Sequence, residues 1–264
     1  MRAFIVAFIG LCWLTSGIAP SSAQDVAQLE SADGAETFKA IRMDGNLVRW
    51  QGPAGGARPE ITYRVLTGPR AFAGALNCSA MTGLHGLLAA SGIASSAFES
   101  ELAAAFAMWE AVADLTFRKA APDEPANILI GAQVDPQGWA FANLSYDAAS
   151  PLPIKPISRA LICLNPERLW KVGFDGNLEA CDLRRTLAHE IGHAIGLDHP
   201  SGPGQVMGHR YEERFRDLQP GDVLGAVALY GAPLRRANTV APSQTAASWE
   251  AKQGETRAFN LGSP

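Results

Sequence analysis

Three histidines and one glutamate near residue 190 have the spacing of a metal site. His189 and His193 are four residues apart, and His199 follows six residues later. On an α-helix, residues four apart lie on one face, so two imidazoles there can bind one ion at about 2.0–2.1 Å. Glu190 comes directly after the first histidine, where it can reach a water on the metal instead of the metal itself.

The residue that should bring the third histidine to the metal is Gly196. It falls just past the second ligand, where a helix ends most easily with a left-handed residue that glycine adopts at little cost. His199 can then return as a third ligand from outside the helix. Three protein ligands leave one position open, which is typical of catalytic rather than structural zinc. We therefore predict one catalytic zinc ion, with Glu190 as the catalytic base.

The run His189–His199 resembles the zinc motif of the metzincin metallopeptidases, and within them the matrixin branch. The full pattern fixes five positions, three of them histidine, so chance occurrence in one chain is on the order of one in 10⁵. Met207 stands where matrixins place the turn that forms an apolar floor under the imidazoles. Residues 218–231 resemble the closing matrixin helix, and the likeness covers about residues 59–231.

The resemblance implies an α+β fold of the metzincin, or zincin-like, type. We expect a mixed twisted sheet, a catalytic helix beneath it and a small lower subdomain after His199. Protein or peptide substrates should lie in the cleft between these parts, beside an edge strand near 139–145 that contains Phe141. The resemblance also assigns Tyr211 to the wall of the substrate cleft.

The chain departs from animal matrixins in several ways. No histidine lies between His85 and His189, so the family's second, structural zinc should be missing. No cysteine lies in residues 24–77, so the family's cysteine switch is not available, and Pro200 replaces the usual serine. Calcium ligands are a weaker expectation, because no EF-hand spacing supports them and solvated turns are the simpler interpretation. The residues concerned are Asp135, Asp147, Asp175 and Asn177.

Hydrophobic periodicity and turn residues indicate alternating strands and helices. A helix at 183–195 should follow Asp182 as N-cap and carry the first two ligands. Residues 70–96 give no clear pattern. The other expected elements are strands at 61–66, 115–117, 128–130, 139–145 and 160–164, and helices at 98–113 and 220–229.

The two ends of the chain differ in composition from the middle. Residues 1–23 are typical of a secretory signal peptide, since an apolar stretch follows Arg2 and small residues precede Gln24. A membrane anchor is the alternative, but the apolar stretch is shorter than the roughly 20 residues a span needs. Residues 24–58 are expected to be a poorly ordered leader or pro-segment. Residues 232–264 are expected to be a disordered tail.

Export would place the mature chain in an oxidising compartment, with Cys78, Cys163 and Cys181 remaining. Three cysteines allow at most one internal disulfide. We favour Cys163–Cys181, because the first ends a strand and the second directly precedes the expected catalytic helix. A bond from Cys78 to either of them is the alternative.

Composition limits the possible partners. The chain has 264 residues, 47% of them apolar, and a net charge of −4 without basic blocks. Nothing in it favours nucleic acid or an anionic membrane surface. We expect a secreted monomer, extracellular or periplasmic, without stable membrane association. The alternative to an endopeptidase is a non-catalytic binding module in which zinc only stabilises the fold.

Overall fold

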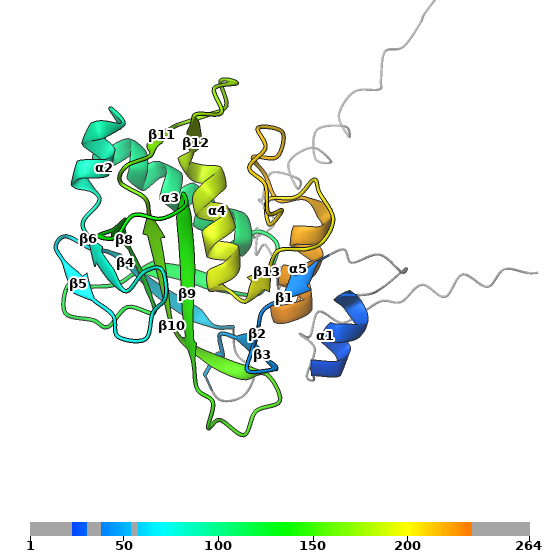
Figure 1. Ribbon diagram of the computed structural model, residues 1–264. Helices are drawn as coiled ribbons and strands as arrows, with labels where there is room; N and C mark the ends of the chain where they lie inside the picture. Colours follow the sequence, from blue (N-terminus) through cyan, green and yellow to red (C-terminus); the bar gives the residue numbers. More distant parts are fainter. Residues whose placement is uncertain (1–22, 31–37, 54–57, 234–264) are drawn as a thin grey trace, which may run out of the picture. The chain divides into compact units, whose positions relative to one another are not determined.

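A nine-stranded mixed sheet is the largest element of the computed structural model, which describes residues 23–30, 38–53 and 58–233 (Figure 1). Six strands follow the order β2-β3-β10-β8-β4-β7. Strand β9 adds antiparallel to β10, whereas β3 and β8 pair with β10 in parallel. The strands of this sheet are β2 (Arg42–Met43), β3 (Asn46–Arg49), β4 (Glu60–Val65), β5 (Arg70–Ala71), β6 (Ala80–Thr82), β7 (Thr116–Lys119), β8 (Ile128–Gln133), β9 (Ala140–Tyr146) and β10 (Lys155–Leu164).

Helices and two short strand pairs complete the described fold. Strand β1 (Lys39–Ala40) pairs with β13 (Leu197–Asp198), and β11 (Leu169–Lys171) pairs with β12 (Ala180–Asp182). The helices are α1 (Ala23–Glu30), α2 (His85–Ala90), α3 (Ser95–Glu110), α4 (Leu183–Ala194) and α5 (Pro220–Tyr230). The expected α+β fold with a mixed sheet is therefore confirmed.

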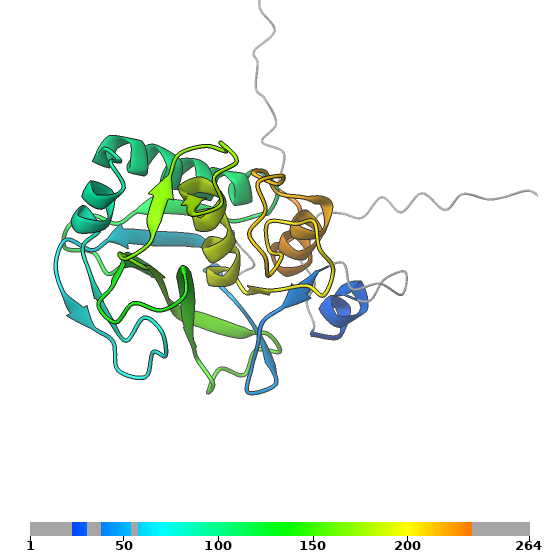
Figure 2. The ribbon, with the colours of Figure 1, turned by 45° about the horizontal axis from the view of Figure 1, so that its top comes forward.

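The core lies where α3 and α4 pack against each other and the sheet. Both figures of the ribbon show α3 and α4 side by side, with β9 running along α4 (Figures 1 and 2). Trp109 of α3 is fully buried, and its indole nitrogen donates to the Ala188 carbonyl at 2.9 Å. The helical periodicity that predicted α3 reflects the face with Phe98, Leu102, Phe106 and Trp109, which is buried in this core. The expected strands and helices all form, with shifted ends.

The expectation of a poorly ordered leader is wrong for the described part of residues 24–58. Strand β3 belongs to the main sheet, and Leu47, Val48 and Trp50 are buried in the core. In α1, Val26 is also buried. Because these side chains complete the core, the domain extends well before the boundary expected at residue 59. The expected signal peptide and tail lie outside the described residues, apart from Ala23 and residues 232–233.

The favoured disulfide pairing is also wrong. Cys78 bonds to Cys163, across 85 residues of sequence, and Cys181 is a buried free thiol. The physical reason is a contact between segments that are far apart in the sequence. The Asn143 side-chain oxygen accepts from the backbone N–H of Cys78 at 2.9 Å, which holds this loop against the β9–β10 pair that contains Cys163. Cys181 lies on β12 instead, beside β11.

Candidate active site

Helix α4 positions the first two histidines. Asp182 is the N-cap, as expected. Its carboxylate accepts a hydrogen bond from the Arg185 N–H at 2.9 Å. The helix ends at Ala194, and Gly196 follows with φ +103°. A Cβ at Gly196 would lie 2.6 Å from the Val48 carbonyl oxygen, so both the backbone angle and the close neighbour require glycine.

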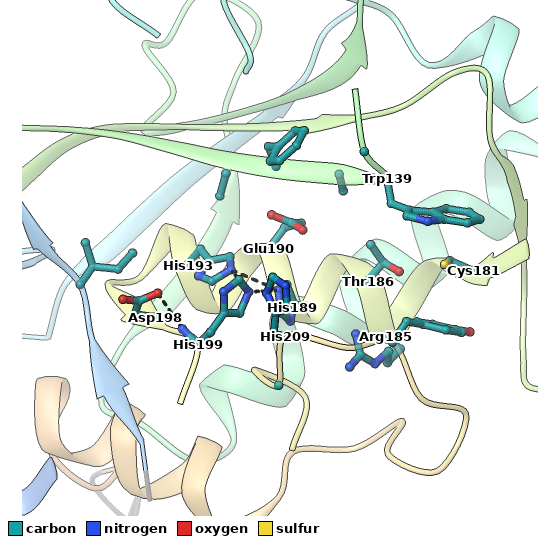
Figure 3. Close-up of a pocket in the computed structure, with 17 residues that line it drawn as sticks. Trp139, Cys181, Arg185, Thr186, His189, Glu190, His193, Asp198, His199 and His209 are labelled. Carbon is teal, nitrogen blue, oxygen red and sulfur yellow. Dashed lines mark hydrogen bonds between the residues drawn. The ribbon is translucent and has the colours of Figure 1, made fainter. Parts of the chain in front are cut away.

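The three histidines converge on one point, as expected from their spacing (Figure 3). Their Nε2 atoms lie 3.0 Å apart for His189–His199, and 3.1 Å apart for His193 with each of the other two. The three rings come from two different backbone directions, because His199 follows the turn at Gly196 and β13. Among the described residues, these three form the one group with the geometry of a metal site.

Hydrogen bonds fix which nitrogen of two rings carries the proton. His189 Nδ1 lies 2.7 Å from the Val206 carbonyl oxygen, and His193 Nδ1 lies 2.7 Å from the Leu197 carbonyl oxygen. A carbonyl only accepts, so each Nδ1 must donate, and each Nε2 is left with a bare lone pair. Backbone carbonyls orient metal-binding histidines in this way.

Two bare Nε2 lone pairs about 3.1 Å apart repel each other unless a cation lies between them. The donor set and spacing fit zinc, since two nitrogens at about 2.0–2.1 Å from one tetrahedral ion lie roughly 3.3 Å apart. Burial lowers the pKa of His189 well below its usual value and that of His193 to about 4. It also lowers the pKa of His199. The rings are therefore neutral near pH 7, as metal ligands must be.

Glu190 lies beside the histidines without joining them. Its side chain is buried, and its Oε2 atom has no hydrogen-bond partner in the described residues. Burial raises the pKa of Glu190 to about 8, although Arg185 opposes this shift. A carboxyl group that lines a cleft with one oxygen unpaired, and whose pKa lies near neutrality, is suited to taking up and releasing a proton.

Met207 lies against α4. It is buried, and its sulfur occupies the space next to Gly192, where an added Cβ would come within 2.2 Å. Asp222 of α5 holds this turn, because its carboxylate accepts from the N–H groups of Val206 and Met207, both at 2.9 Å. Val206 in turn accepts from His189. The turn therefore supports α4 by packing at Gly192 and His189 by a hydrogen bond.

The histidines open onto a cleft of about 650 Å³. Both residues expected in a substrate cleft, Phe141 and Tyr211, line it. Two further residues line it: His209, whose ring centroid is 5.0 Å from that of His199, and Ile41, which follows β1. Neither position carries a periodic or motif signal that would have found it. Cys181, expected in a disulfide, also lines the cleft.

Three of the four residues considered for calcium have other partners. Asp175 pairs with Lys171, and Asp147 accepts from the Ala149 N–H at 3.0 Å within its own turn. Asn177 accepts from the Glu179 N–H at 2.9 Å. These contacts are the turn bonds that such residues commonly make.

No helix of the described chain is long and apolar enough to cross a membrane.

Comparisons with known proteins agree with this site. The family model described as "Matrixin" matches residues 88–231. Mouse "Matrix metalloproteinase-19" is 32% identical over 143 residues, covering 48% of this chain and 24% of the relative. The "Probable matrix metalloproteinase 095L" of Invertebrate iridescent virus 3 is 32% identical over 130 residues, covering 49% of this chain and 28% of the relative. Rat "Stromelysin-2" is 29% identical over 152 residues, covering 54% of this chain and 30% of the relative.

The matched region includes α4, the turn at Gly196, the residues around Met207 and the last described helix. The alignments with the first relatives cover only 24% to 36% of the length of those proteins. The family model matches more than half of this chain, so the chain belongs to the matrixin family, within the metzincin peptidases.

Proposed function

We propose that this chain is a zinc-dependent endopeptidase, with zinc held by His189, His193 and His199 and with Glu190 as general base. The observation that carries the proposal is the set of three mutually facing Nε2 atoms beside a carboxylate with an unpaired oxygen, all at the floor of an open cleft. The family and the relatives named above support the same class of reaction.

Each group would have one task in the hydrolysis. A zinc ion bound by the three imidazoles would acidify water and polarise a carbonyl group. Glu190 takes the proton of the attacking water on its unpaired oxygen and then donates it to the leaving amine. The Val206 and Leu197 carbonyls keep the bare nitrogens of His189 and His193 aimed at the metal throughout. The extended substrate lies along β9, which among the described strands pairs only with β10.

The test is a Glu190→Gln variant, which keeps the shape of the side chain and all three ligands. We expect it to retain one zinc per chain by elemental analysis and to lose hydrolysis by about 10²–10⁴-fold, the usual contribution of a positioned acid–base group. Wild type treated with a chelator should lose activity and regain it with added zinc. Near-normal turnover by folded, zinc-loaded Glu190→Gln would exclude Glu190 as the base.

The second function is a non-catalytic module in which zinc only stabilises the fold. A casein or gelatin gel assay with zinc-loaded wild type separates the two. Digestion that stops with chelator favours the endopeptidase. A stable, zinc-loaded chain that digests neither protein nor a peptide library favours the module.

We also propose that the chain is exported as a monomer, extracellular or periplasmic, after removal of residues 1–23. Amino-terminal sequencing of the protein recovered outside the cytoplasm should then begin near Gln24. Protein found only in the cytoplasm, with an intact amino terminus, would contradict export. Light scattering of the purified chain tests the monomer.

A further inference from the structure

The cleft contains one buried cation that has no acidic partner. Arg185 lies one helical turn before His189 on α4, so both side chains leave the same side of the helix (Figure 3). Only 4% of Arg185 is exposed, and the residue lines the cleft. Trp139, Cys181 and Thr186 lie at the same end of the cleft, on one side of Glu190 (Figure 3).

The neighbouring arginines are different, because both are neutralised. Arg184 donates to the Glu101 carboxylate at 2.7 Å. Arg216 donates to Glu101 at 2.9 Å and to Asp182 at 3.0 Å. These two side chains tie α3 and the start of α4 together, and their charges are matched by the two carboxylates.

The Arg185 guanidinium makes weaker contacts. One nitrogen donates to the Arg210 carbonyl at 3.2 Å, and the Tyr211 ring lies 5.1 Å from the guanidinium carbon. Its Nε atom has no hydrogen-bond partner among the described residues, and no carboxylate there lies within ion-pair distance. Burial lowers the pKa of this group, and the charges of Asp222 and Glu212, which lie beyond ion-pair distance, oppose that shift more weakly. Guanidinium stays charged near neutral pH. A buried charge without a directly paired counter-charge is unfavourable and attracts an anion.

The cleft itself offers no carboxylate to match it. Of the described lining residues only Glu190 and Asp198 are acidic. Asp198 pairs with Lys39 at 2.8 Å, and Glu190 is the proposed general base. A carboxylate that pairs directly with Arg185 would therefore come from a molecule that enters the cleft.

We propose that the Arg185 end of the cleft binds an acidic side chain of the substrate, so that the peptidase prefers Asp or Glu at one of the first two positions from the scissile bond. The range is one to two residues, because Arg185 lies about 5–6 Å along α4 from His189 and extended peptide residues advance about 3.3 Å each. A guanidinium matches a carboxylate in both charge and hydrogen-bond geometry. This inference rests on the proposed endopeptidase function.

The test uses peptides that differ only in Glu versus Gln at each position flanking the cleavage site. For wild type we expect kcat/KM to favour Glu at one flanking position by about tenfold or more, as hydrogen bonds between charged groups do. In Arg185→Met the ratio should fall to about one, and in Arg185→Lys it should be intermediate. Arg184→Met is the matched control, since it removes the same charge from the same helix outside the cleft, and it should keep the wild-type ratio.

Binding separates this proposal from the proposed chemistry. Fluorescence anisotropy with the inactive Glu190→Gln protein should show the same preference for the Glu peptide, lost when Arg185→Met is added. Selective binding without cleavage by wild type would contradict the endopeptidase and leave the acidic site standing. Equal binding of the two peptides, equal cleavage of both by wild type, or a preference that survives in Arg185→Met would each overturn the acidic site. The wild-type measurements decide this even if Arg185→Met does not fold.

Discussion

Helix α4 and the N-terminal strands β1–β3 meet at the metal site, but they are stabilised in different ways. The helix has twelve residues, its own N-cap and hydrogen bonds between near neighbours in sequence. Strands β1 and β2 have two residues each, and β1 pairs with β13, more than 150 residues away. The three-histidine site therefore has a local part, His189 and His193, and a part, His199, that depends on segments far away in the sequence.

The N-terminal strands surround the turn that leads to His199. The Ile41 N–H donates to the Gly196 carbonyl at 2.7 Å, and the Val48 carbonyl lies directly against Gly196. The Trp50 indole donates to the Ala194 carbonyl at 2.8 Å, at the last residue of α4. We infer that residues 38–50 hold the third ligand in place, which the following variants test.

Removing the N-terminal segment should have the largest effect. A chain that begins at Arg58 lacks the buried side chains of Phe38, Leu47, Val48 and Trp50. Each contributes about 1.5–3 kcal/mol on burial, so their sum approaches the 5–15 kcal/mol that stabilises a whole domain. We expect no cooperative thermal unfolding by circular dichroism and no retained zinc. A chain that begins at Ala23 is the control, and equal stability of the two chains would contradict our view of this segment.

Gly196→Val should have the next largest effect. The change adds a β-branched residue at φ +103° and places its Cβ against the Val48 carbonyl, so His199 or the strand beside it must move. We expect much weaker zinc retention in dialysis and a matching loss of peptidase activity.

Gly45→Val is the matched control for Gly196→Val. Gly45 also has positive φ, +79°, but nothing lies within 4 Å of its Cβ position. This variant should lose stability by about 1–2 kcal/mol from backbone strain and keep its zinc. If both variants kept zinc equally, the contact between the two regions would not support the third ligand.

The sequence predicted the local part of the site better than the distant part. The spacing of His189 and His193 and the N-cap Asp182 are recognisable because they act within one helix. Strand β1 leaves no such pattern, since two residues cannot show a period and the partner is far along the chain. The same limit explains the disulfide error, because contacts formed on folding, such as the one with Asn143, bring Cys78 to β10. Arg185 was also missed, since its missing partner is visible only once burial is known.

Trp50→Phe should have a moderate effect. It removes the donor to the Ala194 carbonyl and leaves that buried oxygen unpaired, which costs about 1–3 kcal/mol. Urea unfolding should show this loss, with faster release of zinc to a chelator. Trp170→Phe is the control, because it removes a similar buried bond, to the Asn165 carbonyl at 3.1 Å, away from the N-terminal strands. Equal rates of zinc release from the two variants would argue against a special role for Trp50.

Lys39→Met should have the smallest effect, although Lys39 is the residue of β1 directly opposite Asp198. Its ammonium lies 2.8 Å from the Asp198 carboxylate, but the two side chains remain 44% and 34% exposed. Exposed pairs of this kind contribute about 0–1 kcal/mol and weaken further with salt. We therefore expect stability within about 1 kcal/mol of wild type and unchanged zinc retention in 0.5 M salt, where the Debye length is only about 4 Å. The backbone bond from Ile41 and the packing at Gly196 would then carry the support of His199. If Lys39→Met instead released zinc as readily as Gly196→Val, the support would come from charge, and the distant part of the site would depend on one exposed side chain.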